Sequence, residues 1–258
     1  MPLELHEIDP EVDFPALARC LYESYEDPLQ KFFYVWFPIF GDTETAREDS
    51  IDEAAERLAK WHAEDPSSYW QKVIDTETGG IAGAALWNIH KQNPFTQEHD
   101  VEVAWFPNDG SRKFTKQMIE LHNAPRALLG QRPHVCKSTR PDRDDQMLSA
   151  NTDLFIIYTS PTYRRRGVGQ QFMSWGMKKA DEMGVEMFLD STPMGRALYE
   201  RNGFVTVKDN IIVPQTDKPD EAWNELEKNT GPVPFYLMWR PVGGNYEEGK
   251  TILPWENE

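Results

Sequence analysis

Two stretches decide the fold: Thr159–Phe172, TSPTYRRRGVGQQF, and Leu189–Val205, LDSTPMGRALYERNGFV. The first lies between a strand-like run and a helix-like run, and it holds three arginines and two glycines. Glycines let a backbone approach a ligand closely, and the N–H groups at a helix start attract anions. Neighbouring arginines add charge-assisted donors. The pattern favours a pyrophosphate site.

Two other phosphate-binding motifs do not fit this stretch. A Rossmann fingerprint needs a third glycine where the chain has Phe172, and a P-loop needs Gly-Lys-Ser/Thr, which is absent. An ordinary glycine turn with solvated arginines remains the alternative to an anion site.

The hydrophobic periodicity around these stretches predicts alternating strands and helices. From the first stretch onward we expect strand, helix, strand, helix and strand at 153–160, 170–184, 185–191, 193–203 and 204–209. An acidic loop at 214–231 then precedes a closing strand at 233–241. Upstream we expect a strand at 3–8, helices at 10–25 and 43–63, a glycine-turn hairpin at 67–89, and a helix at 111–129 that Pro125 kinks or ends.

Both stretches resemble known motifs of one enzyme superfamily. TSPTYRRRGVGQQFM is similar to motif A of the GNAT N-acyltransferases, Arg/Gln-x-x-Gly-x-Gly/Ala, and the match extends over 158–171. LDSTPMGRALYERNGFV resembles motif B, which covers 190–204 here. The order and separation of the two motifs are those of the family, and the chain looks like one of its fungal members.

The resemblance implies an α+β fold with three layers, an α/β arrangement in which helices flank a central, mixed, mostly antiparallel and splayed β-sheet. We expect a single domain over 1–241, with enlarged connections at 89–150 and 211–232, and a C-terminal tail at 242–258. It also implies acetyl-CoA as the acyl donor. The strand residues that would hold its pantetheine arm are Tyr158, Thr159 and Ser160. The residues that would bind its pyrophosphate are Arg164, Arg165, Arg166, Gly167, Val168, Gly169, Gln170 and Gln171.

Acyl transfer from a thioester to an amine needs a polarised carbonyl, a proton for the leaving thiolate and a base for the amine proton. The resemblance assigns the acid to Tyr199. Asp190, at a strand end, is the first candidate for the base, because relatives often carry an acidic residue there. Glu102 is the second candidate. Packed or solvated side chains without a catalytic role remain the alternative for all three.

The charge of the chain restricts its partners. The chain has 43 Asp and Glu residues and 27 Lys and Arg residues, so its net charge is −16. This charge disfavours binding to nucleic acid and to membrane surfaces. Residues 1–66 hold 17 acids and 5 bases, whereas 137–179 hold 8 bases and 4 acids. In the family the first two helices commonly wall the acceptor site, so a small cationic amine is the expected acceptor.

Cysteine and histidine usage completes the sequence picture. Two cysteines, Cys20 and Cys136, cannot form a disulfide framework, and the N-terminus lacks a signal pattern, so we expect a cytoplasmic protein, with the nucleus as alternative. Six scattered histidines predict no metal site.

The closing strand and the tail are candidates for a homodimer contact. Two other functions remain open: a protein or peptide N-acetyltransferase, and a non-catalytic acyl-CoA-binding module.

Overall fold

The computed structural model describes residues 2–90, 102–129 and 151–256. The chain divides into two compact units. The first comprises Met1–Trp87, Phe155–Trp175 and Asn224–Gly231, and the second Asn88–Leu154, Gly176–Trp223 and Pro232–Glu258. Among the described residues, no helix combines the length and the apolar character needed to cross a bilayer.

The first unit contains a sheet whose strands follow one another in the order β1-β2-β3-β4. These strands are β1 Leu3–Glu7, β2 Ser68–Asp75, β3 Ile81–His90 and the second part of β4 Asn151–Thr159. β1 and β2 pair antiparallel. Between β2 and β3 the Asp75 N–H donates to the Gly80 carbonyl at 2.9 Å, and Gly79 has φ +72°. This confirms the predicted hairpin turn, in which a glycine supplies the positive φ.

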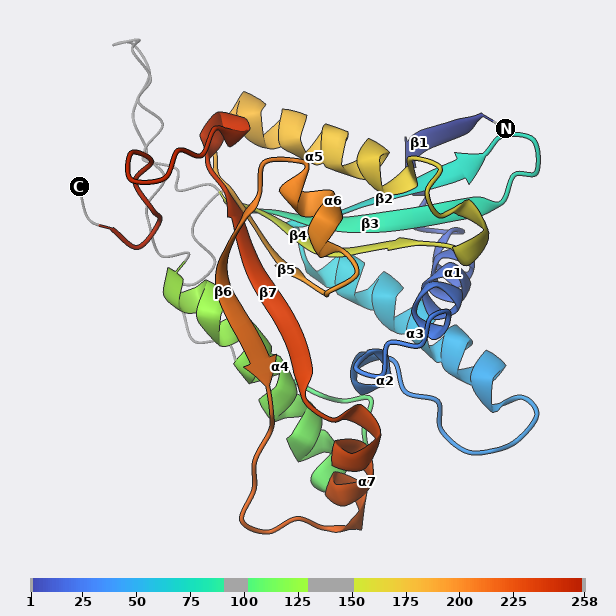
Figure 1. Ribbon diagram of the computed structural model, residues 1–258. Coiled ribbons are helices and arrows are strands. Elements are labelled where there is room, and N and C mark those ends of the chain that lie inside the picture. The colour runs from blue at the N-terminus through green and yellow to red at the C-terminus, as the bar shows by residue number, and fades with distance from the viewer. Residues whose placement is uncertain (1, 91–101, 130–150, 257–258) are drawn as a thin grey trace. The chain divides into compact units, whose positions relative to one another are not determined.

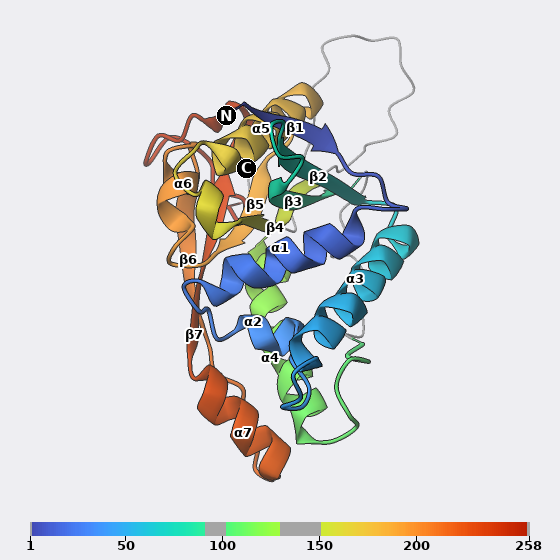
Figure 2. The same ribbon diagram turned by 90° about the vertical axis from the view of Figure 1, so that its right-hand side faces the viewer.

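Helices cover both faces of this sheet, which gives three layers. They are α1 Phe14–Glu26, α2 Phe33–Trp36, α3 Ala46–Glu64 and the first part of α5 Val168–Met183. On β2 the Tyr69 ring stacks on Trp175 of α5 at 4.8 Å, while the next residue, Trp70, meets Phe14 of α1 edge-on at 5.9 Å. Since successive strand residues face opposite sides, α5 and α1 lie on opposite faces. Figures 1 and 2 show α3 beside α1.

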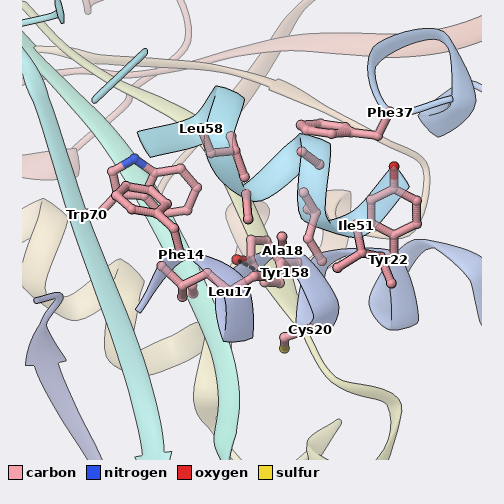
Figure 3. Packing of buried hydrophobic residues seen from close by; sticks show 14 of the residues in the cluster. Phe14, Leu17, Ala18, Cys20, Tyr22, Phe37, Ile51, Leu58, Trp70 and Tyr158 are labelled. Atoms are coloured by element: carbon pink, nitrogen blue, oxygen red, sulfur yellow. Dashed lines mark hydrogen bonds between the residues drawn. The ribbon is translucent and has the colours of Figure 1, made fainter. Parts of the chain in front are cut away.

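The core of the first unit lies between α1, α3 and the sheet, as Figure 3 shows. Leu17 and Ile51 are almost fully buried there, and the Cys20 thiol lies 3.8 Å from the Ile81 carbonyl. The aromatic run at 32–40 contributes Phe33 and Phe37, whose rings stack at 5.2 Å. Both rings are therefore core residues, and the run forms only the four-residue helix α2.

The second unit contains strands in the order β4-β5-β7-β6. They are the first part of β4, β5 Met187–Ser191, β6 Val205–Ile212 and β7 Val233–Arg240. β7 pairs antiparallel with both β5 and β6, whereas β4 pairs parallel with β5 over Thr152–Leu154. That ladder ends at Leu154 and Leu189, although both strands continue. The pairing is thus mixed and mostly antiparallel, as the resemblance implied.

Two helices of the chain correct the sequence interpretation. The predicted loop at 214–231 contains a helix, α7 Glu221–Thr230, whose start is capped by Asp220 accepting the Trp223 N–H at 2.9 Å. The segment is acidic overall, but one side of the helix is buried: Trp223 on that side is only 4% exposed. α4 Gly110–Leu129 confirms the helix predicted at 111–129, and because it continues through Pro125, the alternative in which this proline ends the helix is wrong. The predicted connection at 130–149 lies outside the described residues.

Candidate active site

The predicted site residues fall into two groups, one in each unit. The candidate cofactor residues, Tyr158 to Gln171, belong to the first unit, and Glu102, Asp190 and Tyr199 to the second. The first group follows β4 into the start of α5, and Tyr199 lies on the short helix α6 Arg196–Glu200.

The end of β4 is fixed from two sides within the first unit. The Tyr158 hydroxyl donates to the Leu17 carbonyl of α1 at 3.0 Å, so this side chain belongs to the core. The Ser160 N–H donates to the Ala82 carbonyl of β3 at 3.0 Å. A Cβ added to Gly83 would lie 2.4 Å from the Tyr158 carbonyl oxygen, so β3 needs a glycine there. The Ser160 N–H is therefore already used in the hydrogen bond to Ala82.

The turn that follows β4 has an unusual backbone. A 3₁₀ turn at Pro161–Tyr163 leads into Arg165, with φ +60°, and Gly167, with φ +86°. A left-handed arginine is costly and is typical of functional turns. α5 then starts at Val168, and its first internal bond runs from the Gln171 N–H to the Gly167 carbonyl at 3.1 Å. The N–H groups at 168–170 come before Gln171, the first residue whose N–H donates within the helix, and they form an anion-attracting end.

The three consecutive arginines have different environments. Arg164 donates through Nη2 to the Ser24 carbonyl near the end of α1 at 2.8 Å, which stabilises a helix C-terminus. Arg165 and Arg166 are exposed, and the Arg166 guanidinium lies 4.9 Å from the centre of the Tyr163 ring. One arginine thus fastens the turn to α1, while the next two present their charge to solvent.

The remaining candidate cofactor residues continue this turn into α5. Val168 is 1% exposed, and its Cγ1 lies 2.9 Å from where a Cβ on Gly83 of β3 would stand, so its side chain is structural. Gln171 reaches the Leu3 carbonyl of β1 at 3.4 Å, whereas Gln170 is exposed and lies 3.3 Å from the Ser174 hydroxyl. The turn therefore offers backbone N–H groups, two guanidinium groups and one exposed amide to an anion.

In the second unit, Tyr199 is held on α6 by a glycine and an aromatic ring. Its side chain is 5% exposed, and its ring meets Phe204 edge-on at 6.0 Å. A Cβ at Gly195 would lie 2.8 Å from Cε2 of Tyr199. The helix ends with Gly203 at φ +82° and the Phe204 N–H donating to the Tyr199 carbonyl at 3.2 Å, a glycine-terminated helix end. The motif B sequence thus fixes both the ring and the backbone of Tyr199.

Asp190 lies in a buried ion pair. Its Oδ2 accepts from Nη2 of Arg126 on α4 at 2.6 Å, and the two side chains are 3% and 8% exposed. Its Oδ1 is buried and has no hydrogen-bond partner among the residues that the structure describes. His122, one turn before Arg126, has its ring 4.6 Å from that of Phe235 and bonds the Asn123 side chain at 3.1 Å. Burial lowers the pKa of His122, although the nearby Asp190 charge opposes the shift.

Sequence reasoning missed several of these partners. Arg126 and His122 lie one turn apart on α4, and this helical spacing is the one signal that places them on the same face. Nothing in the sequence pairs Arg126 with an aspartate 64 positions later. Glu102, the second candidate base, is exposed and lies outside helices and strands. In the described ranges no group of three His, Cys, Asp or Glu side chains is arranged to hold a metal ion.

Comparison with known proteins identifies a domain in part of the chain. Residues 136–206, which include the arginine-glycine turn, Asp190 and Tyr199, match the model of the acetyltransferase (GNAT) domain. The chain carries a GNAT acetyltransferase domain. The GNAT domain makes the protein an acyltransferase enzyme. No curated protein sequence matches it.

Solved structures share the fold of this GNAT protein at low sequence identity. An arylalkylamine N-acetyltransferase of Aedes aegypti is 14% identical, with a TM-score of 0.57, and the match covers 94% of this chain and 100% of that one. A polyamine N-acetyltransferase of Drosophila melanogaster is 11% identical, with a TM-score of 0.56 and coverage of 93% and 100%. A histone acetyltransferase HPA2-related protein of Corynebacterium glutamicum is 18% identical, with a TM-score of 0.51 and coverage of 96% and 99%. The mixed sheet with flanking helices is therefore the GNAT fold.

Proposed function

We propose that this GNAT enzyme transfers an acetyl group from acetyl-CoA to the amine of a small cationic acceptor, by direct attack within a ternary complex. The observation that carries the proposal is the turn before α5, where left-handed Arg165 and Gly167 expose guanidinium groups and helix N–H groups together. We place the enzyme in the cytoplasm, a reducing compartment suited to the free thiol of Cys20.

The turn has the donors that a diphosphate requires. The N–H groups at the start of α5 point out of the helix end, and Arg165 and Arg166 add charge-assisted donors. The Ser160 N–H bonds Ala82 and the Tyr158 carbonyl faces Gly83, both on β3, so we assign the pantetheine arm to the backbone of Thr159, which points to the opposite side of the strand. Arg164 contributes by holding the turn against α1.

The reaction forms an N–C bond and breaks the C–S bond of the thioester. The unprotonated amine attacks the carbonyl carbon, and a backbone N–H near the end of β4 polarises the carbonyl oxygen. Tyr199 donates its phenolic proton to the departing thiolate. Asp190 or Glu102 takes the amine proton, directly or through water. For Asp190 the acceptor atom is Oδ1, because Oδ2 is occupied by Arg126.

The charge of residues 1–66 supports a cationic acceptor. Four of the five basic residues in this segment pair within it: Arg19 with Glu48, Arg47 with Glu26, Arg57 with Glu53, and Lys60 with Glu64. The positive charges are therefore compensated locally, and the surplus of acidic side chains remains. Asp52 and Glu56 are exposed on α3. Such a field attracts a protonated amine and repels an anionic one.

Donor binding tests the first half of the proposal. Calorimetry is expected to detect CoA binding to the full chain, and Arg166→Ala is expected to weaken it about tenfold, the order of one charge-assisted contact. Lys178→Ala removes one exposed positive charge from α5 outside the turn and serves as the matched control. Equal affinities in the parent and Arg166→Ala would refute the assignment of the turn.

An acceptor panel tests the second half. Thiol release from acetyl-CoA is measured with arylalkylamines, diamines, neutral amino compounds and lysine-containing peptides. Small cationic amines are expected to give the highest kcat/KM, and Asp52→Asn with Glu56→Gln is expected to raise the KM for a diamine more than for a monoamine. The Glu64→Gln variant is the control on the same helix. Preference for peptides would identify a protein acetyltransferase, and CoA binding without transfer would identify a binding module.

A further inference from the structure

Tyr163 links the turn before α5 to a buried carboxylate. Its hydroxyl donates to Oδ2 of Asp75 at 3.1 Å, and Asp75 is fully buried. The other oxygen of Asp75 accepts the Glu77 N–H at 3.1 Å, and its backbone closes the β2–β3 turn. The carboxylate is therefore fixed by the hairpin before it meets Tyr163. A second anchor is the bond from the Tyr163 N–H to the Ser160 carbonyl at 2.9 Å.

The anchored ring supports one of the two exposed guanidinium groups. Arg166 lies over the Tyr163 ring at 4.9 Å, within the range of a cation–π contact. No carboxylate pairs with Arg166 in the parts of the chain that the structure describes. The ring restricts where the guanidinium can lie without neutralising its charge. Arg165, one residue earlier, is equally exposed but takes its position from its left-handed backbone.

We propose that Tyr163 is a positioning residue: held by Asp75, its ring orients Arg166 toward the diphosphate of the acyl donor. This rests on the proposed use of acetyl-CoA and deepens it by naming how the arginine is held in place. An arginine that is oriented before the donor binds loses less side-chain freedom on binding. The acetyl group and the amine do not take part, so the effect falls on donor affinity and not on the chemical step.

The test compares two acyl donors on the full chain. Acetyl-CoA carries the diphosphate, and S-acetyl-pantetheine lacks it. Tyr163→Leu is expected to raise the KM for acetyl-CoA about fivefold with kcat unchanged, the order of a cation–π contact, and to leave the KM for S-acetyl-pantetheine unchanged. Tyr163→Phe keeps the ring and loses the Asp75 bond, so its effect is expected to be about twofold. An equal rise for both donors would show a merely structural ring and overturn the proposal.

A double-mutant cycle locates the effect in Arg166. In an Arg166→Ala background, Tyr163→Leu is expected to change the KM for acetyl-CoA by less than about twofold, because the contact is already absent. A fivefold rise of the KM in that background would overturn the proposed role of Tyr163 and leave the proposed role of Arg166 in donor binding intact. If Arg166→Ala itself leaves the KM for acetyl-CoA unchanged, the proposed donor site fails together with this inference.

Asp65 supplies a matched control for Asp75. Asp65 accepts the N–H of Ser67, two residues on, at 2.8 Å, the same local contact that Asp75 makes with Glu77. Asp75→Asn preserves the hairpin contact and lets the amide donate to the Tyr163 hydroxyl, so partial retention of donor selectivity is expected. Asp65→Asn is expected to leave the ratio of the two donors unchanged. A change of that ratio in Asp65→Asn as large as that in Asp75→Asn would contradict the specific anchor.

Discussion

The arginine-glycine turn of the first unit and the Asp190–Tyr199 region of the second use their side chains in opposite ways. In the turn, Arg165 and Arg166 are exposed, and the backbone carries the constraint through φ angles of +60° at Arg165 and +86° at Gly167. Asp190 and Tyr199 have buried side chains that already contact Arg126 and Phe204. In the proposed function, the anion site is therefore built by fixing the backbone, whereas the proposed proton-transfer groups depend on the side chains around them.

We expect the largest effect of a substitution at the buried ion pair of Asp190 and Arg126. Asp190→Asn leaves the Arg126 guanidinium without its carboxylate in a nearly closed environment, so we expect a loss of about 3 kcal/mol in the free energy of unfolding. This corresponds to a Tm lower by roughly 6–12 °C, measured by calorimetry. The double variant Arg126→Met with Asp190→Leu should regain most of the stability. If Asp190 is the base, the double variant stays inactive; full activity in it would exclude that role.

A variant of Tyr199 in the second unit distinguishes an effect on the chemical step from an effect on CoA binding. Tyr199→Phe removes one hydroxyl and keeps the ring against Phe204, so stability and CoA affinity should change little. As the proton donor, Tyr199 should contribute about 10²-fold to kcat. Steady-state kinetics across pH would check this, because the variant should also lose the alkaline limb of the profile. Unchanged kcat and an unchanged profile would remove Tyr199 from the mechanism.

Gly167 tests the backbone constraint of the turn. Gly167→Ala adds only a methyl group, and nothing lies within 4 Å of the new Cβ, so any effect comes from φ +86°. A left-handed alanine costs about 1–2 kcal/mol, so CoA affinity should fall about tenfold if the turn relaxes to another conformation. Calorimetry with CoA measures it. Gly41→Ala is the control, since that glycine also has a positive φ and open space. Similar CoA affinity in both variants would contradict the assignment.

His122 should give the smallest effect, on pH dependence. Burial lowers its pKa in the folded state, so the unfolded chain takes up the proton first as pH falls through about 6.5. Stability contributed by neutral His122 is therefore present above that pH and lost below it. His122→Gln should reduce the loss of unfolding free energy between pH 7 and 5 by under about 1 kcal/mol, as measured by urea unfolding at each pH. A steeper acid loss in His122→Gln would refute the sign.

The same contrast explains what the sequence could and could not predict. The glycine turn between a strand and a helix was predicted at its position, because glycines at fixed spacing favour such a backbone locally, whereas the left-handed Arg165 was not predicted and the ligand of the turn stays a prediction. The Asp190 site was predicted only as a position, because its partner Arg126 comes from a helix 64 residues earlier. α7 was taken for a loop, since its acidic residues conceal the capping by Asp220 and the buried Trp223. Long-range side-chain pairing leaves no local pattern to find.

The burial of Cys20 has a practical consequence for labelling this enzyme. Desolvation raises the pKa of its thiol to about 12, so the reactive thiolate is scarce at neutral pH, and the side chain is 4% exposed. Maleimide reagents should therefore not modify Cys20 in the native protein. With Cys136 replaced by serine, a new surface cysteine becomes the single attachment point for a fluorophore or spin label, and the packed thiol of Cys20 on α1 can stay as it is.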